Sequence, residues 1–236
     1  LVRRRWSVGV GPSALVRRGG DFGDIARTRQ IALEQGREDA HVEQMETQSD
    51  MTMHLEGKLL IAMPGMEDPR FEGAVILLCS HTADGAMGLI VNKPTPGIRF
   101  EALLKQLKIP HQGNDRDIIV HFGGPVERSR GFVLHSADYQ TVGPTMEIAG
   151  GYNMTATQDV LTALGEGKGP KTALLALGYA GWAAGQLEAE ILRNDWLTAE
   201  APADLVFSDN DSGKWGGALR RMGVNPSGLS AVSGRA

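Results

Sequence analysis

Short apolar runs that end at glycine, proline or asparagine dominate residues 54–224, and most of them are typical of β-strands. The run 74–79 is continuously apolar, which predicts a strand buried on both faces. Asp84-Gly85 is a turn signal between this run and 88–91, so the two are expected to form a hairpin. The predicted strands are 58–63, 74–79, 88–91, 118–122, 131–135, 145–148, 172–177 and 204–207.

Four other segments carry apolar residues three and four positions apart, the period of a helix with one buried face. Thr157 is placed to cap the second of them and Gly165 to end it, and Gly223 follows the fourth. The predicted helices are 100–107, 156–164, 182–192 and 215–222. Strands dominate the first half and strands alternate with helices in the second, which predicts an α+β fold with a mainly antiparallel sheet. One domain spans 54–224, and the polar residues 225–236 are expected to be a flexible tail.

The first 53 residues differ from the rest because they have no sustained apolar period. Their charge is split: residues 1–30 are strongly basic and residues 31–53 strongly acidic. Such a segment buries too little apolar surface to offset its ordering entropy, so we expect a disordered or non-native N-terminal extension. Met45, Met51 and Met53 lie just before the folded pattern, and translation starting at one of them is a hypothesis. A transit peptide and a basic arm for nucleic acid are the competing interpretations of residues 1–30.

Composition excludes several classes of protein. A single Cys is incompatible with a disulfide framework or a zinc site built from several cysteines. No apolar run approaches the ~20 residues needed to cross a bilayer. The chain has a formal net charge of −4, and residues 54–236 hold 16 basic and 20 acidic side chains. We therefore expect a cytoplasmic protein without membrane contact, and the acidic balance argues against direct nucleic-acid binding.

Cys79 and His81 are the first candidates for chemistry. Residues two apart on a strand share a face, so the thiol and the imidazole are expected to point the same way. A protonated imidazole would lower the pKa of the thiol and raise its reactivity, as in a redox sensor or a thiol enzyme. The competing interpretation is that Cys79 is a small buried apolar residue.

The segment 123–131 places a glycine-rich turn beside two arginines. The backbone N–H groups of Gly123 and Gly124 could form a nest for a small anionic ligand, with Arg128 and Arg130 as counter-charges. A tight turn that needs glycine for its backbone angles explains the same residues.

The segment 178–188 leads from a buried strand into a helix. Tyr179 and Trp182 would supply a pocket wall, and Gly181 a close backbone approach. The unpaired N–H groups at the start of the helix, where Gln186 lies, would suit an anion or a carboxylate. A packed turn in which Trp182 anchors the helix is an equally good interpretation. Further along, Glu190 and Arg193 are expected to form a solvated pair.

Histidines at strand ends raise the possibility of a metal site. His121 and His135 end two predicted strands, and with Cys79 and His81 they could gather around a metal, although nothing in their spacing requires it. A metal-dependent hydrolase would use the three histidines. The dinucleotide-binding, serine-hydrolase and H-E-x-x-H motifs are absent from the sequence, and 165–172 lacks the G-K-[ST] order of a phosphate loop. No metal and no cofactor is therefore predicted.

Several blocks of residues resemble those of the AlgH/YqgE family of bacterial proteins. They are Gly57–Phe71, Val75–Pro94, His121–Val126, Gly131–His135, Gly178–Trp182 and Gly185–Glu188. The resemblance covers about residues 54–224 and implies a cytoplasmic α+β domain with a folded-over sheet. It also implies a regulatory role, since the family has been called transcriptional regulators, and it transfers no catalytic residue. Asn92, in the second block, joins the candidate binding residues.

Two functional hypotheses follow. The first is a non-enzymatic binding or regulatory protein, which acts through a protein partner or a small anionic ligand. The second is a thiol-based redox sensor or enzyme centred on Cys79 and His81. A structure tests whether the candidates converge on one cavity: Cys79, Arg128, Arg130, Tyr179 and Trp182.

Overall fold

One long strand, β9 (Ala173–Ala183), joins the two halves of the sheet. Up to Leu177 it pairs antiparallel with β6 (Val126–Ser136) and parallel with β5 (Ile119–Phe122), and after a shift in register Tyr179 pairs once more with Val126 of β6. From Ala180 it pairs antiparallel with β3 (Gly85–Ile90) instead. Gly178, with φ +73°, lies at the register shift between β9 and β6, in the left-handed conformation that favours glycine.

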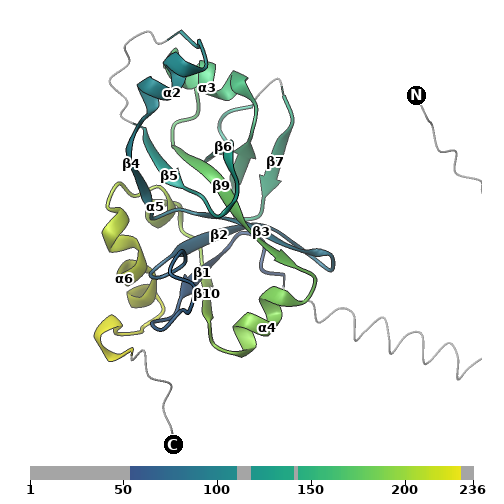
Figure 1. Cartoon of the computed structure of the whole chain (residues 1–236), viewed down its shortest axis with the longest axis vertical. Coiled ribbons are helices and arrows are strands. Elements are labelled where there is room, and N and C mark those ends of the chain that lie inside the picture. The colour runs from purple at the N-terminus through teal and green to yellow at the C-terminus, as the bar shows by residue number, and fades with distance from the viewer. Residues whose placement is uncertain (1–53, 111–117, 141–142, 230–236) are drawn as a thin grey trace, which may run out of the picture. The chain divides into compact units, whose positions relative to one another are not determined.

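The computed structural model describes residues 54–110, 118–140 and 143–229 (Figure 1). The sheet runs in the order β10-β1-β2-β3-β9-β6-β8-β7, with β5 also beside β9 and β4 beside β5. Every pairing is antiparallel except that of β5 with β9, which confirms the predicted α+β class. The other strands are β1 (Lys58–Ala62), β2 (Val75–Thr82), β4 (Pro94–Arg99), β7 (Thr145–Ile148), β8 (Tyr152–Thr155) and β10 (Trp196–Glu200).

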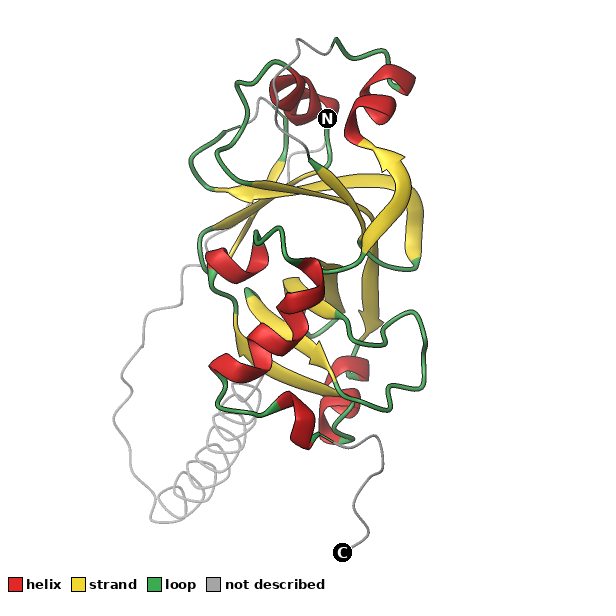
Figure 2. Cartoon of the chain, turned by 90° about the vertical axis from the view of Figure 1, so that its left-hand side faces the viewer, coloured by secondary structure: helices red, strands yellow, loops and turns green. Residues whose placement is uncertain are grey.

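Helices cover the sheet in three places. Helices α2 (Phe100–Gln106) and α3 (Gln158–Gly165) form one group, α4 (Gln186–Leu192) lies by itself, and α5 (Ala203–Val206) and α6 (Asp211–Arg221) form the third. The 3-10 turn η1 (Pro226–Gly228) follows α6. Figure 2 shows α5 and α6 across the space between the upper and lower strands. No helix in the described ranges is both long enough and apolar enough to span a membrane.

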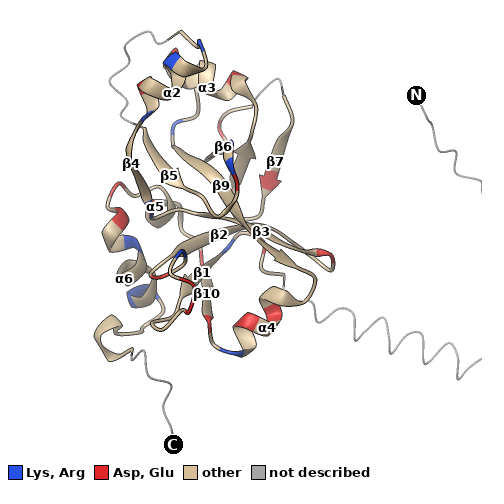
Figure 3. Ribbon diagram, viewed as in Figure 1, with Lys and Arg blue, Asp and Glu red and all other residues tan. Residues whose placement is uncertain are grey.

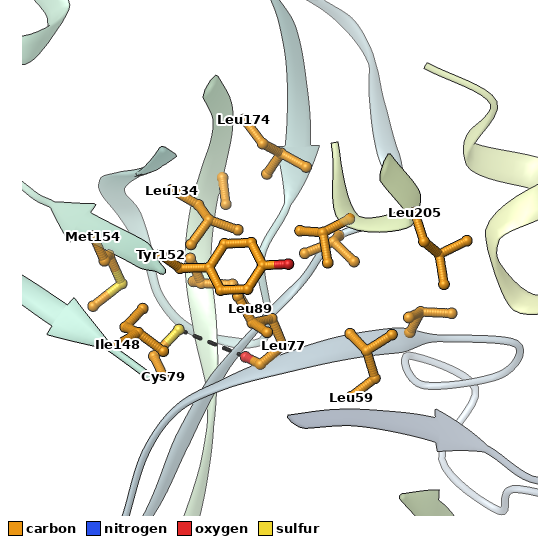
Figure 4. Close-up of a cluster of buried hydrophobic side chains, with 14 of the residues drawn as sticks. Leu59, Leu77, Cys79, Leu89, Leu134, Ile148, Tyr152, Met154, Leu174 and Leu205 are labelled. Atoms are coloured by element: carbon orange, nitrogen blue, oxygen red, sulfur yellow. Dashed lines mark hydrogen bonds between the residues drawn. The ribbon is translucent and has the colours of Figure 1, made fainter. Parts of the chain in front are cut away.

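Three apolar clusters follow from the period-two alternation of the strands. Leu59 and Ile61 of β1 enter a first cluster, which contains side chains from both halves of the sheet and from α5 and α6 (Figure 4). Leu60 and Ala62 enter a second cluster on the opposite face, beneath α4. The third lies under α2 and α3. The sheet is therefore folded over the first cluster, and α5 and α6 close one side of it.

Several predicted elements differ from the observed ones. The run 204–207 is not a strand: Ala203–Val206 form helix α5 after Pro202, because a four-residue apolar run does not distinguish a strand from a buried helical turn. The helix predicted from Trp182 begins at Gln186, since β9 continues through Ala183. Strands β4, β8 and β10 were missed, and α6 begins at Asp211, where the Asn210 side chain caps it.

The hairpin of β2 and β3 and the position of Gly223 after α6 are confirmed. Residues 1–53, on which the extension was predicted, lie outside the described residues. So do residues 230–236 of the predicted tail, whereas 225–229 contain η1, and Leu229 packs against the first cluster.

Candidate functional site

A groove of about 980 Å³ opens between the two halves of the sheet. It lies between the β2–β3 turn and β7, on the side of the fold away from α6 (Figure 1). We call it the apolar groove; its apolar walls are Met87, Phe132, Met146, Met154, Tyr179 and Trp182. Four of these also belong to the first core cluster or pack against it, namely Met87, Phe132, Met154 and Tyr179. The groove is thus the end of the folded-over core that no helix closes in the described part of the chain.

Several of the predicted binding residues meet in the apolar groove. Arg130, Tyr179, Gly181 and Trp182 all line it. The Tyr179 ring packs edge-on against Phe132, with centroids 5.9 Å apart. The Arg130 guanidinium lies 5.1 Å from the centroid of the Phe132 ring, and its Nη1 lies 3.1 Å from Glu127 Oε2. Arg130 therefore gives the rim of the groove a cation that already has a carboxylate partner.

Cys79 and His81 do not share a face, so this prediction is wrong. The ladder between β2 and β3 shifts register between Leu78 and Ser80, which is a β-bulge at Cys79. The extra residue breaks the alternation: Cys79 points into the first cluster (Figure 4), while His81 Nε2 lies 2.8 Å from Glu188 Oε1 on α4. Burial raises the pKa of the Cys79 thiol to about 12, so the reactive thiolate is scarce at neutral pH.

The glycines of the 123–131 turn are explained by close packing. Gly124 has φ +156°, and a Cβ on it would lie 2.0 Å from the carbonyl carbon of Tyr179. The N–H of Gly123 donates to the Leu177 carbonyl oxygen at 2.8 Å, so it is not available to an anion. Arg128 packs over the Phe122 ring, 5.6 Å from its centroid, and does not line the apolar groove.

Asn92 also has a structural role. Its Oδ1 accepts from the Val75 N–H at 2.8 Å, and its Nδ2 donates to the Gly73 carbonyl oxygen at 2.9 Å. The side chain thereby ties the end of β3 to the start of β2.

His135 lies buried behind the wall of the apolar groove. Its Nδ1 donates to the Ser136 carbonyl oxygen at 2.9 Å, so the Nε2 of the neutral ring accepts from the Thr155 hydroxyl at 3.0 Å. The Thr155 oxygen then accepts from the hydroxyl of Thr145, 2.9 Å away, and Thr145 lines the groove. Burial lowers the pKa of His135, which keeps the ring neutral. The buried His135 therefore orients, through Thr155, the hydroxyl of Thr145 at the groove wall. The spacing of residues along the strands did not predict this hydrogen-bonded chain.

Gln186 and Trp182 converge on the carboxylate of Glu190, a side chain of the same helix, which takes the place of the anionic ligand expected at the helix start. Oε1 of Gln186 accepts from the Ala183 N–H, and its Nε2 donates to Glu190 Oε1 at 2.9 Å. The other oxygen of Glu190 accepts from the indole N–H groups of Trp182 and Trp196, each at 2.8 Å. The predicted solvated pair of Glu190 and Arg193 is wrong, because Arg193 pairs with Asp195 at 2.9 Å.

Sequence reasoning missed a buried charged network on α6. His121 Nε2 lies 3.0 Å from Asp211 Oδ1, and the Lys214 ammonium lies 2.9 Å from the same oxygen. Lys214, only 1% exposed, also donates to the Val91 carbonyl oxygen at 2.7 Å. His121, Asp211 and Lys214 line a cavity of about 420 Å³, and their hydrogen bonds fasten α6 to the ends of β3 and β5. The Asn210 cap and the i, i+3 spacing of Asp211 and Lys214 are signals in the sequence. His121 lies 90 residues from Asp211 in the chain, so no local pattern connects the two.

The three histidines of the metal hypothesis have separate partners. His81 bonds Glu188, His121 bonds Asp211, and His135 bonds Ser136 and Thr155. Among the described residues, no group of three or more His, Cys, Asp or Glu side chains is arranged to hold a metal ion.

Comparison with known proteins identifies the family. A family model described as AlgH-like matches residues 59–227. The chain belongs to the AlgH-like family. A UPF0301 protein of Cereibacter sphaeroides is 61% identical over 184 residues, which are 78% of this chain and 100% of that protein. A UPF0301 protein of Bradyrhizobium diazoefficiens is 52% identical over 190 residues, 78% of this chain and 89% of its own.

Two solved structures share the fold. The solution structure of the AlgH protein from Pseudomonas aeruginosa has a TM-score of 0.64 and 42% identity, covering 78% of this chain and 97% of that chain. A crystal structure of protein DIP2367 from Corynebacterium diphtheriae, 24% identical with a TM-score of 0.56 over 73% of this chain and 88% of its own, supports the fold. All the residues that line the apolar groove lie within the part of the chain that the AlgH-like family model matches.

Proposed function

We propose that this AlgH-like protein is a non-enzymatic, cytoplasmic binding protein with a regulatory role, which acts by holding a protein partner in the apolar groove. The observation that carries the proposal is the convergence of three methionines, Met87, Met146 and Met154, with Phe132 and Tyr179 in one groove open to the surface. Methionine side chains are flexible and polarisable, so they suit a surface that adapts to the side chains of a partner.

The edge of the sheet supports a polypeptide as the partner. In the described part of the chain, β7 is the last strand of the sheet, and residues 144–146 at its start line the groove. An extended segment can pair with the open edge of a strand through its backbone and place alternate side chains in an adjacent groove. Met146, 40% exposed on β7, is positioned to meet such a segment.

Charge favours a protein over a nucleic acid as the partner. Residues 54–236 hold four more acidic than basic side chains, and the groove itself contains Asp84 and Glu127 besides Arg130. A phosphate backbone would be repelled by this balance. The regulatory role then consists of occupying or reshaping a surface of the partner protein, and a role as transcriptional regulator is exerted through that partner.

Site-specific crosslinking in living cells tests the proposal. A photo-crosslinking amino acid replaces Met146 in the groove or, as a matched control, Met222, which is 38% exposed at the end of α6. We expect a discrete adduct from position 146 that position 222 does not give. The adduct should weaken strongly when Tyr179→Ala removes part of the groove wall. Identical adducts from both positions, or an adduct from position 146 that is indifferent to Tyr179→Ala, would contradict the proposal.

A further inference from the structure

A second pocket, of about 770 Å³, lies along α4 and shares Val126, Gly181 and Trp182 with the apolar groove. We call it the Glu190 pocket; the residues that carry the argument are Glu67, Phe71, Trp182, Gln186, Glu190 and Trp196. Three of them form a ladder of edge-on rings. Phe71 contacts Trp196 with centroids 5.7 Å apart, and Trp196 contacts Trp182 at 6.0 Å.

The Glu190 carboxylate is held in place by neutral donors. Two indole N–H groups reach one of its oxygens and the Gln186 amide reaches the other, at 2.8–2.9 Å. An amide oxygen at this position could accept both indole bonds equally well, so these contacts do not require a negative charge. Three neutral donors orient the carboxylate without cancelling its charge.

The two arginines at the rim of the Glu190 pocket already have partners. Arg70 makes a fork-shaped pair with Asp68, with Nε 2.9 and 3.0 Å from its two oxygens, and Arg193 pairs with Asp195 at 2.9 Å. In each pair the aspartate neutralises the arginine, so the two pairs add no net charge to the pocket. Among the described residues lining the pocket, the negative charges of Glu190 and Glu67 are left without a cation. The acidic positions of α4 are visible in Figure 3.

We propose that the Glu190 pocket binds an organic cation, a guanidinium or ammonium group. The fixed carboxylate supplies a charge-assisted hydrogen bond, and the half-buried Phe71 ring, which the Arg70 guanidinium already approaches to 6.0 Å, supplies an electron-rich surface of the kind on which such cations rest. Trp182 and Trp196 are buried and hold the carboxylate through their N–H groups. Glu67, exposed at the rim, adds long-range attraction. The site is separate in chemistry from the apolar groove, so it stands or fails independently of the partner proposed there.

Titration of the full-length chain with three probes tests the site. Agmatine represents a free cation, blocked Gly-Arg-Gly represents an arginine side chain of a protein, and blocked Gly-citrulline-Gly is its neutral counterpart. We expect one of the cationic probes to bind and the citrulline peptide not to bind, as measured by calorimetry. Binding of agmatine only identifies a free cation as the ligand, whereas binding of the arginine peptide identifies a protein side chain.

Variants separate the site from non-specific attraction. Glu190→Gln should weaken binding about tenfold, the worth of one charge-assisted hydrogen bond. Glu147→Gln, an equal charge change on the exposed face of β7, should leave binding unchanged. Glu67→Gln should weaken binding about two- to threefold. The Glu67 side chain is exposed and makes no structural bond among the described residues, so this variant should fold even if Glu190→Gln does not. It therefore provides a second test of the pocket. The proposal is overturned if neither cation binds, if the citrulline peptide binds equally well, or if Glu147→Gln weakens binding as much as the pocket variants.

Discussion

The backbone of Gly178 passes so close to that of Gly124 that a Cβ added to Gly178 would lie 2.5 Å from the Gly124 carbonyl oxygen. Gly178 lies at the register shift in the pairing of β9 with β6, just before β9 begins to pair with β3 at Ala180, and the close approach of the two segments requires glycine at both positions. The contact belongs to backbone atoms, which cannot move aside as a flexible side chain can.

Gly178→Ala should therefore destabilise the protein by more than its backbone angle alone would cost. Gly185 is the matched control, since its φ of +72° is within a degree of the +73° of Gly178, but nothing lies within 4 Å of the Cβ it would receive. We expect Gly185→Ala to cost about 1–2 kcal/mol, the price of a left-handed alanine. Gly178→Ala should cost at least about 2 kcal/mol more. Urea unfolding measures both, and equal losses would show that the close approach tolerates a side chain.

The buried ammonium of Lys214 predicts a large effect of a single substitution. Lys214→Met leaves Asp211 buried without its ammonium partner, so we expect a loss of about 3–5 kcal/mol in the free energy of unfolding. Lys58→Met, which breaks the exposed pair with Glu200, should cost less than about 1 kcal/mol. Equal losses of unfolding free energy in the two variants would show that the buried network on α6 stabilises the protein no more than an exposed ion pair does.

The same network predicts how stability depends on pH. Burial acts to raise the pKa of Asp211, but the hydrogen bonds from His121 and Lys214 outweigh it and hold that pKa below its usual range. The folded state thus binds the proton less readily than the unfolded chain. The stabilisation is present above the ordinary aspartate pKa of about 3.9 and is lost as the pH falls through the lower folded value.

Asp211→Asn isolates this contribution. The difference in unfolding free energy between the wild type and Asp211→Asn should be largest near pH 7 and shrink as the pH falls below about 4. Urea titrations at pH 7, 4 and 3 measure it. A difference that is constant across this range would mean that the Asp211 carboxylate titrates alike in the folded and unfolded states.

Cys79 should be almost inert in the native protein. With a pKa raised to about 12 by burial, its thiolate is rarer at pH 7 than that of a free thiol by about three orders of magnitude. A disulfide reagent should therefore modify Cys79 only as fast as the protein unfolds. Modification of the native protein at the rate of a model thiol would revive the hypothesis of a thiol-based sensor.

The sequence predicted the fold better than the site, for reasons that lie in particular residues. Continuous apolar runs such as 74–79 predicted β2 correctly because burial on both faces leaves a pattern in the composition itself. The bulge at Cys79 leaves no such pattern, since it depends on how β2 pairs with β3. Because of this bulge, His81 lies on the face of β2 opposite the Cys79 thiol, with which it was predicted to share a face.

The candidate residues that did meet, Tyr179 and Trp182, lie on one strand, where local spacing is informative. The groups that were missed depend on contacts between distant segments. Thr145 reaches His135 through Thr155, and Asp211 reaches His121 across 90 residues. Side-chain chemistry identified His121 and His135 as candidates, but only the folded chain determines which groups face them.

The continuity of β9 through both halves of the sheet also bears on how the protein folds. Neither half can be completed without the strand that the other half uses, so formation of each half assists the other. A chain built in this way has no internal boundary at which one half could melt first. Amide hydrogens on both sides of Gly178 should then exchange with solvent water through the same global opening, at one common free energy.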